Sequence, residues 1–376
     1  MQGNYAIFQR ANDGTLVRML PEYTRLHALL TLNNAGKWEL SNTSRDVCPF
    51  EPNSGILVAR NNIAFFGGIL TEIQDDLDAK TGLHKWQISG VTDLGILGRR
   101  VCYVSPSDGS TTTHSHYEDT GYLSQVVETL IRKNIGTLAL SDRREPIIMN
   151  NNVTPFGSPV SISLRFQNLL KAVTTIATAN YYNIRPVWDQ DNQKVYFELF
   201  TGRDLTDSII FTEQLSNITA SEYIASSPEG NWIIAGGKGE MTQRAFGYAS
   251  DPDSISEWGR IEKFQDGRNQ DDVDTYADET LRDKSGNCVG YSVEVSDSDT
   301  APQFGKDYDL GDYVGMKVHG QFVTAQVQQV EIEVQEGIET ISPKFGTVAI
   351  GKFKNIFQQL SSLRQDVDEL LGTEIE

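Results

Sequence analysis

Residues 63–73 read IAFFGGILTEI and contain the longest apolar stretch of the chain, Ile63 to Leu70. Three further short apolar segments lie around it and are separated by Asn, Gly and Asp, which are typical turn residues. These segments are Lys37–Leu40, Ile56–Arg60 and Lys85–Gly90. Short apolar runs between turns are typical of antiparallel strands. The pattern therefore predicts an antiparallel sheet or small β-barrel over residues 1–100, with residues 205–240 as candidates to complete it.

The apolar period changes from strand-like to helical in the middle of the chain, where two segments show spacings of three and four. One face comprises Leu123, Val126, Val127, Leu130 and Ile131, and the other comprises Phe166, Leu169, Leu170, Val173 and Ile176. After them, Val187–Trp188 and Val195–Phe200 flank the turn-rich Asp189–Asn192, which indicates a β-hairpin. We expect an α+β domain over residues 101–204.

Strand-like segments return in the last third of the chain, at Tyr291–Val295, Tyr313–Val318 and Phe322–Val334. They predict a second β-barrel domain over residues 241–350. The expected fold class is therefore α+β and mainly β, with two small barrel-like domains on either side of an α+β region.

Residues 351–376 carry a heptad pattern, because their apolar residues recur at spacings of 3, 4, 3, 4 and 3; they are Phe353, Ile356, Leu360, Leu363, Val367 and Leu370. Such a stripe predicts a C-terminal coiled-coil helix that drives oligomerisation. The heptads alone do not decide between a dimer and a trimer. A second interpretation is that this short amphipathic helix docks on its own domain.

The charge and cysteine content narrow the class of protein. Lys and Arg total 32 against 51 acidic residues, a net charge of −19, so a nucleic-acid-binding surface lacks its electrostatic basis. The three cysteines, Cys48, Cys102 and Cys288, are too far apart in sequence to indicate a disulfide framework or a thiolate metal site. No secretory signal is visible and no apolar stretch is long enough to span a bilayer. We expect a soluble protein, made in a cytosol, with no membrane partner.

Candidate sites for metal or nucleotide chemistry are weak. His114 and His116 would project from the same side of an extended strand, but no third ligand follows them, and their Ser/Thr-rich surroundings favour an exposed loop. The glycines of Gly236–Gly239 follow a strand as in a phosphate-binding loop, yet the spacing before Lys238 does not fit that motif, and Gly239 follows the lysine where the motif has Ser or Thr. A tight turn is favoured there. The sequence predicts no metal site and no cofactor.

Acidic residues are concentrated between residues 266 and 312; they are Asp266, Asp271, Asp272, Asp274, Asp278, Glu279, Asp283, Glu294, Asp297, Asp299, Asp307, Asp309 and Asp312. Pairs such as Asp297 with Asp299, or Asp307 with Asp309, could bind calcium or serve as the two carboxylates of a glycosidase. The calcium-loop pattern is absent, so a solvated, partner-facing region is favoured. Because no HExxH or GxSxG motif appears in a plausible context either, we expect no enzymatic activity.

Several motifs together resemble a known family. The run AFFGGILTEI (residues 64–73) is followed by WQISGVTDLGILGRR (residues 86–100), FTGRDL (200–205), RIEKF (260–264) and DLGDYV (309–314), with Phe211, Asn217, Asn231 and Gly236 between them. In order and spacing these segments resemble the siphophage tail-tip hub proteins, a family similar to the baseplate hub of contractile phages. The resemblance covers most of residues 30–350.

The resemblance implies a structural virion protein at the tail tip. It implies a homotrimer whose two barrels per chain form a six-barrel ring that continues and closes the tail tube. The implied partners are the tail-tube or distal-tail ring, the tape-measure protein and a tail fibre or receptor-binding protein. DNA would pass through the ring without specific binding, and the family supplies no catalytic residues. The alternatives are a carbohydrate- or receptor-binding tail protein, with Trp258 or Tyr276 exposed, and a cell-wall hydrolase.

Overall fold

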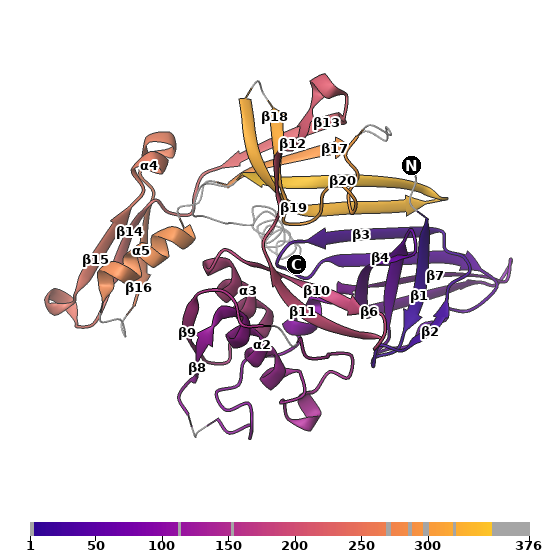
Figure 1. Cartoon of the computed structure of the whole chain (residues 1–376), viewed down its shortest axis with the longest axis horizontal. Coiled ribbons are helices and arrows are strands. Elements are labelled where there is room, and N and C mark those ends of the chain that lie inside the picture. The colour runs from indigo at the N-terminus through magenta and orange to yellow at the C-terminus, as the bar shows by residue number, and fades with distance from the viewer. Residues whose placement is uncertain are drawn as a thin grey trace, which may run out of the picture.

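The computed structural model describes residues 4–111, 114–151, 154–267, 272–284, 288–295, 301–318 and 321–347. The chain is mainly β, as the sequence predicts, with helices gathered in two places (Figure 1). The first β region holds seven strands: β1 (Tyr5–Arg10), β2 (Leu16–Met19), β3 (Arg25–Thr31), β4 (Lys37–Ser44), β5 (Gly55–Arg60), β6 (Ile63–Asp78) and β7 (Leu83–Thr92).

The middle region mixes helices with two hairpins. Its elements are α1 (Gly95–Gly98), β8 (Tyr117–Tyr122), α2 (Leu123–Asn134), η1 (Ser141–Arg143), β9 (Pro159–Leu164), α3 (Leu169–Ala179), β10 (Asn183–Asp189) and β11 (Lys194–Phe200). Both predicted helices form, and their apolar residues fill a core of their own. Phe166 is the exception: it precedes α3 with a φ of 51° and is exposed. The predicted hairpin is β10–β11, in which Trp188 pairs with Val195.

The last third of the chain contains two separate β units. Strands β12 (Asp204–Thr212), β13 (Ile218–Ser226), β17 (Cys288–Val295), β18 (Tyr313–Val318), β19 (Gln321–Gln335) and β20 (Ile338–Thr347) join the main sheet, and η2 (Glu213–Leu215) lies between the first two. An insert lies between β13 and β17 and contains β14 (Trp232–Gly236), η3 (Met241–Gln243), β15 (Phe246–Ser250), α4 (Pro252–Trp258), β16 (Glu262–Asp266) and α5 (Val273–Lys284). It stands apart from the main sheet at the left of Figure 1.

The expectation of two closed barrels is not met, because the two β regions form one open 13-stranded sheet. Its order is β13-β17-β20-β19-β3-β4-β7-β6-β5-β1-β2, and β18 pairs with both β19 and β12. The sheet does not close into a barrel because of the strand with which β3 pairs. Instead of closing onto β2, β3 pairs along its whole length with the second half of β19, from Arg25 opposite Gln335 to Thr31 opposite Gln329. The first half of β19 pairs with β18.

The core of the main sheet follows from this pairing, since it combines residues from both ends of the chain. Leu26, Ala28 and Leu40 pack in one cluster with Val330 and Ile332. The middle region has its own cluster, and the insert has a small third one. The predicted boundaries at residues 100, 204 and 240 remain a prediction.

Trp38 packs tightly against Gly68 of β6 and Gly90 of β7. Its indole is 2% exposed and donates a hydrogen bond to the Val91 carbonyl oxygen at 3.1 Å. A Cβ at Gly68 would lie 2.1 Å from the indole nitrogen, and one at Gly90 would lie 2.5 Å from the ring. The two glycines therefore create the space that this side chain fills.

We predict that Gly90→Ala destabilises the chain by at least about 2 kcal/mol, because the added methyl overpacks a full core and also meets the Ile69 carbonyl oxygen at 2.0 Å. Gly98→Ala is the matched control, since its nearest neighbour would be a Leu170 methyl at 3.8 Å. Its unfolding free energy should change by no more than about 0.5 kcal/mol. Urea unfolding of the two variants measures the difference, and equal stabilities would contradict the packing argument.

A half-buried carboxyl group on α2 predicts a pH dependence. Glu128 accepts a hydrogen bond from the Asn151 backbone N–H at 3.0 Å, but burial raises its pKa from 4.5 to about 7, against the weaker opposing effects of that bond and of Arg132. The folded chain therefore binds more protons than the unfolded chain between these pH values, so its contribution to stability falls as pH rises from 4.5 to 7.

Glu128→Gln removes this titration while keeping an oxygen that can accept the Asn151 hydrogen bond. We expect the variant to be more stable than the parent at pH 8, and the advantage to vanish at pH 4, where the parent carboxyl is largely protonated in both the folded and the unfolded chain. Urea unfolding at both pH values tests this. A difference between parent and variant that does not change with pH would show that Glu128 ionises normally.

Candidate interaction site

The ends of the main sheet are candidate interaction sites, because edge strands carry backbone groups that can pair with another chain. The hydrogen-bonded order ends at β13 and at β2, and its side branch through β18 ends at β12. Strand β2 is only four residues long, and Val17 and Met19 on it are each 57% exposed. The backbone N–H of Leu16, the first residue of β2, already donates to Gln193 Oε1 at 3.1 Å. Few backbone groups of β2 therefore remain for a partner strand.

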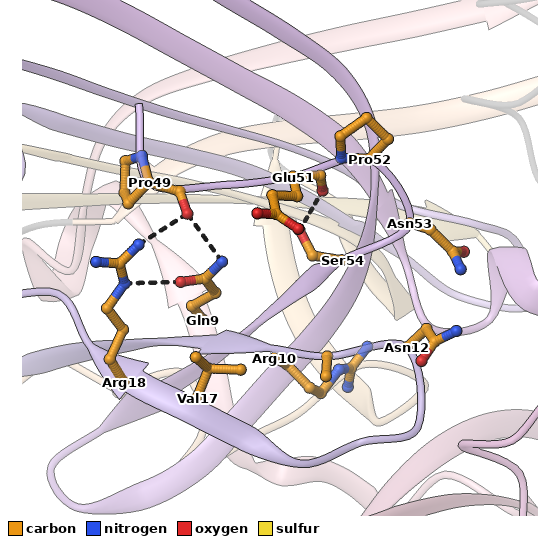
Figure 2. A pocket seen from close by; sticks show the side chains of 11 residues that line it. Gln9, Arg10, Asn12, Val17, Arg18, Pro49, Glu51, Pro52, Asn53 and Ser54 are labelled. Carbon is orange, nitrogen blue, oxygen red and sulfur yellow. Dashed lines mark hydrogen bonds between the residues drawn. The ribbon is translucent and has the colours of Figure 1, made fainter. Parts of the chain in front are cut away.

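A shallow polar pocket lies beside this edge (Figure 2). It has a volume of about 450 Å³ and is bounded by the β1–β2 hairpin and by the loop from Pro49 to Ser54. The Pro49 carbonyl oxygen accepts two hydrogen bonds, from Gln9 Nε2 at 3.0 Å and from Arg18 Nη2 at 2.8 Å. Arg18 Nε in turn donates to Gln9 Oε1 at 2.7 Å. These bonds hold the loop against the hairpin and fix the shape of the pocket.

A buried ion pair lies beneath the pocket and positions β1. The Arg10 guanidinium, which is 1% exposed, binds the Asp93 carboxylate through both terminal nitrogens, with Nη1 to Oδ2 at 2.8 Å. Arg10 Nη2 also donates to the Gly68 carbonyl oxygen at 3.3 Å. The pair thus ties β1 to β6 and to the turn after β7. Removing one partner of such a pair leaves a buried charge, a cost of about 3–5 kcal/mol.

The chemistry of the pocket favours binding over catalysis. Its hydroxyl group, Ser54 Oγ, donates to the Glu51 carbonyl oxygen at 2.7 Å, so it has no general base as its partner. Gln9 and Arg18 hydrogen-bond to each other and to Pro49, which is a structural arrangement. None of the side chains that line this pocket is therefore arranged for nucleophilic catalysis.

The histidines considered as metal ligands lie in an exposed loop before β8. His116 Nδ1 is 3.2 Å from Ser115 Oγ, and both His114 and His116 are exposed. Among the residues that the structure describes, no three histidine, cysteine or acidic side chains are placed to hold a metal ion. Gly236–Gly239 leads from β14 to β15, and the Gly237 N–H donates to the Ala245 carbonyl oxygen at 2.9 Å. These residues open a loop over residues 237–245 that contains η3, which is wider than the tight turn that the sequence favours.

The acidic residues that the structure describes mainly organise turns. Asp312 is 3% exposed and binds Arg203, with Nη2 to Oδ2 at 2.6 Å and the Arg203 backbone N–H to Oδ1 at 2.8 Å. Its Oδ2 also accepts from the Asp309 N–H at 2.8 Å, and burial raises the pKa of Asp309. Asp307 accepts from the Gln303 N–H at 2.8 Å. Asp297 and Asp299 lie outside the described residues.

The proposed oligomerisation residues also lie outside the described part of the chain; they are Phe353, Ile356, Leu360, Leu363, Val367 and Leu370. Sequence reasoning missed the Arg10–Asp93 pair, whose members are 83 residues apart. A single arginine at the end of the largely apolar β1 was the one available signal. Trp258 is only partly exposed and Tyr276 packs against the core of the insert, so neither matches the exposed aromatic that a receptor-binding role predicted.

Comparison with solved structures shows a shared fold. A tail protein from Neisseria meningitidis MC58 aligns with a TM-score of 0.57 at 11% identity, over 91% of this chain and 96% of that one. The 43 kDa tail protein of prophage MuSo2 from Shewanella oneidensis aligns with a TM-score of 0.57 at 12% identity, over 91% and 96%. Prophage tail protein gp18 from Listeria monocytogenes EGD-e gives a TM-score of 0.51 at 12% identity, over 96% and 99%.

The family comparison confirms the resemblance seen in the sequence. No curated protein sequence matches the chain significantly. The model of the siphovirus ReqiPepy6 Gp37-like proteins, however, matches residues 10–347, which is most of the chain. The chain therefore belongs to the siphovirus ReqiPepy6 Gp37-like protein family.

Proposed function

We propose that this chain is a structural protein of the phage tail tip, that three copies form a hub, and that the hub continues and closes the tail tube. The single observation that carries the proposal is the fold, which is shared over nine-tenths of the chain with solved phage tail proteins. The family match agrees with it. A location in the virion tail follows from the same two observations.

The open main sheet supports assembly with other copies. The hydrogen-bonded order of this sheet ends at three strands, β2, β12 and β13, and a ring of copies requires two different surfaces that meet head to tail. The tail-tube ring, the tape-measure protein and a distal fibre are the partners that such a hub would contact. The C-terminal heptads would add a three-helix seam on the ring axis.

A non-enzymatic role fits the site. The pocket beside β2 contains no nucleophile paired with a base, and the acids of residues 301–312 cap turns or bind Arg203. The net charge of −19 suits a channel that DNA crosses without binding. Among the described residues, no helix has both the length and the apolar character needed to cross a bilayer.

We expect the ring to depend on the β regions, with the C-terminal helix adding to its stability. A chain ending at Ile350 should still form trimers, at a higher midpoint concentration than the full chain, because a helix of two to three heptads buries less surface than sheet-edge contacts. Sedimentation velocity across a concentration series measures both chains. If the shortened chain is monomeric while the full chain is trimeric, the C-terminal helix and not the β regions holds the ring together. If both chains are monomeric, the proposed hub is wrong.

A further inference from the structure

The insert exposes an aromatic sheet face. In the order β15-β14-β16, Tyr248, Ile234 and Phe264 lie directly opposite one another, so their side chains share a face. Phe246, opposite Gly236, and Trp232 lie on the same face. Phe246, Tyr248 and Phe264 are 44%, 60% and 52% exposed. The opposite face carries Ile233, Ala235 and Ala249, which are buried with Ala277 of α5.

Two arginines hold the rings of this aromatic face in place. The Arg260 guanidinium lies 3.7 Å from the centre of the Trp232 ring, and it also pairs with Glu262 at 2.6 Å. Arg244 lies 5.6 Å from the Phe264 ring and 6.0 Å from the Phe246 ring, and its Nη2 donates to the Gly236 carbonyl oxygen at 2.9 Å. Aromatic rings and arginines that are ordered before binding are typical of the centres of protein contacts.

The size of the aromatic face favours a tethered partner. An aromatic side chain presents about 150–250 Å². Three half-exposed rings therefore offer roughly 300 Å², well below the ~800 Å² per partner that a stable contact between independent proteins buries. A segment of the same chain does not need that area, because its tether supplies a high effective concentration.

The described chain ends beside this insert. Ser226, the last residue of β13, pairs with Cys288, the first residue of β17. Two residues further along β17, Gly290 pairs with Gly346, the penultimate residue of β20. The chain therefore leaves the main sheet after Thr347 at the same end of the sheet from which the insert departs (Figure 1). Residues 348–376 follow, and their apolar stripe begins at Phe353, six residues beyond Thr347.

We infer that, in the free protomer, the apolar stripe of residues 353–370 docks on the aromatic face of its own insert. The six residues from Thr347 to Phe353 extend at most about 20 Å. The same number of residues leads from Ser226, at the same end of the main sheet, to Trp232 on the face, so the two segments start close together and have the same maximum length. Docking gives the stripe an apolar partner before assembly. What the segment does after assembly rests on the proposed hub, but this contact does not.

Photo-crosslinking tests the contact directly. Benzoylphenylalanine in place of Tyr248 reports what lies on the aromatic face. The matched control carries benzoylphenylalanine in place of Tyr181, which lies on the middle region and is 66% exposed. The full chain is irradiated at a concentration where mass photometry shows monomers. Mixing labelled and unlabelled isotopic forms separates crosslinks within a chain from those between chains.

We expect Tyr248→benzoylphenylalanine to crosslink within the chain to peptides of residues 351–370, at a yield that does not change with protein concentration. The yield should fall at least fivefold with Leu363→Asp on the stripe and be retained with Ser361→Asp beside it. The Tyr181 control should give no such product. Crosslinks only between chains, or none to this segment, would overturn the inference. Trimers seen by sedimentation in that case would leave the proposed hub standing.

Discussion

The pairing of β3 with β19 joins the two β regions into one sheet and determines which of its strands remain at an edge. Seven consecutive residue pairs, from Arg25–Gln335 to Thr31–Gln329, join strands about 300 positions apart in sequence. Side chains add to the backbone bonds, because Arg25 Nε binds Glu333 Oε1 at 2.7 Å and His27 Nε2 lies 2.9 Å from Glu331 Oε1. The hydrogen bond with His27 lowers the pKa of Glu331, which keeps this carboxylate charged. The two β regions thereby share one core.

This pairing also decides which surfaces remain available. Because β3 has β4 on one side and β19 on the other, it cannot close onto β2, and the sheet stays open at β2, β12 and β13. The Arg10–Asp93 pair then fixes β1 and the pocket beside the β2 edge. At the other end, β13, β17 and β20 bring the base of the insert and the last described residue together. Each candidate interaction surface thus follows from where the main sheet ends.

The sequence predicted helices and hairpins whose residues lie within one segment, but it did not predict which distant strands pair with each other. The face from Leu123 to Ile131 gives α2 because every residue needed for the helical period lies within one segment. The β10–β11 hairpin follows in the same way from its turn residues. A barrel and an open sheet have the same alternation within each strand, so the pattern around Ile63–Ile73 could not exclude closure. Only the distant β19 decides it.

For the candidate sites too, local sequence patterns were predictable and the pairing of distant segments was not. The absence of a metal-ligand spacing around His114 and His116 could be seen in the sequence, and the structure places both in an exposed loop. The aromatic face could not be seen. Its rings come from three strands, and nothing in the sequence indicates that Tyr248 and Phe264 both lie opposite Ile234. A helix packed on one side of that sheet, with aromatics on the other, appears only once the register is known.

We propose that this fold assembles as a ring at the end of a phage tail. Electron microscopy of the purified full chain, at a concentration where mass photometry gives the assembled mass, tests it most directly. We expect class averages with threefold symmetry, in which three copies of the main sheet surround the ring axis. Particles of one chain at every concentration, or closed twofold dimers without a channel, would contradict it.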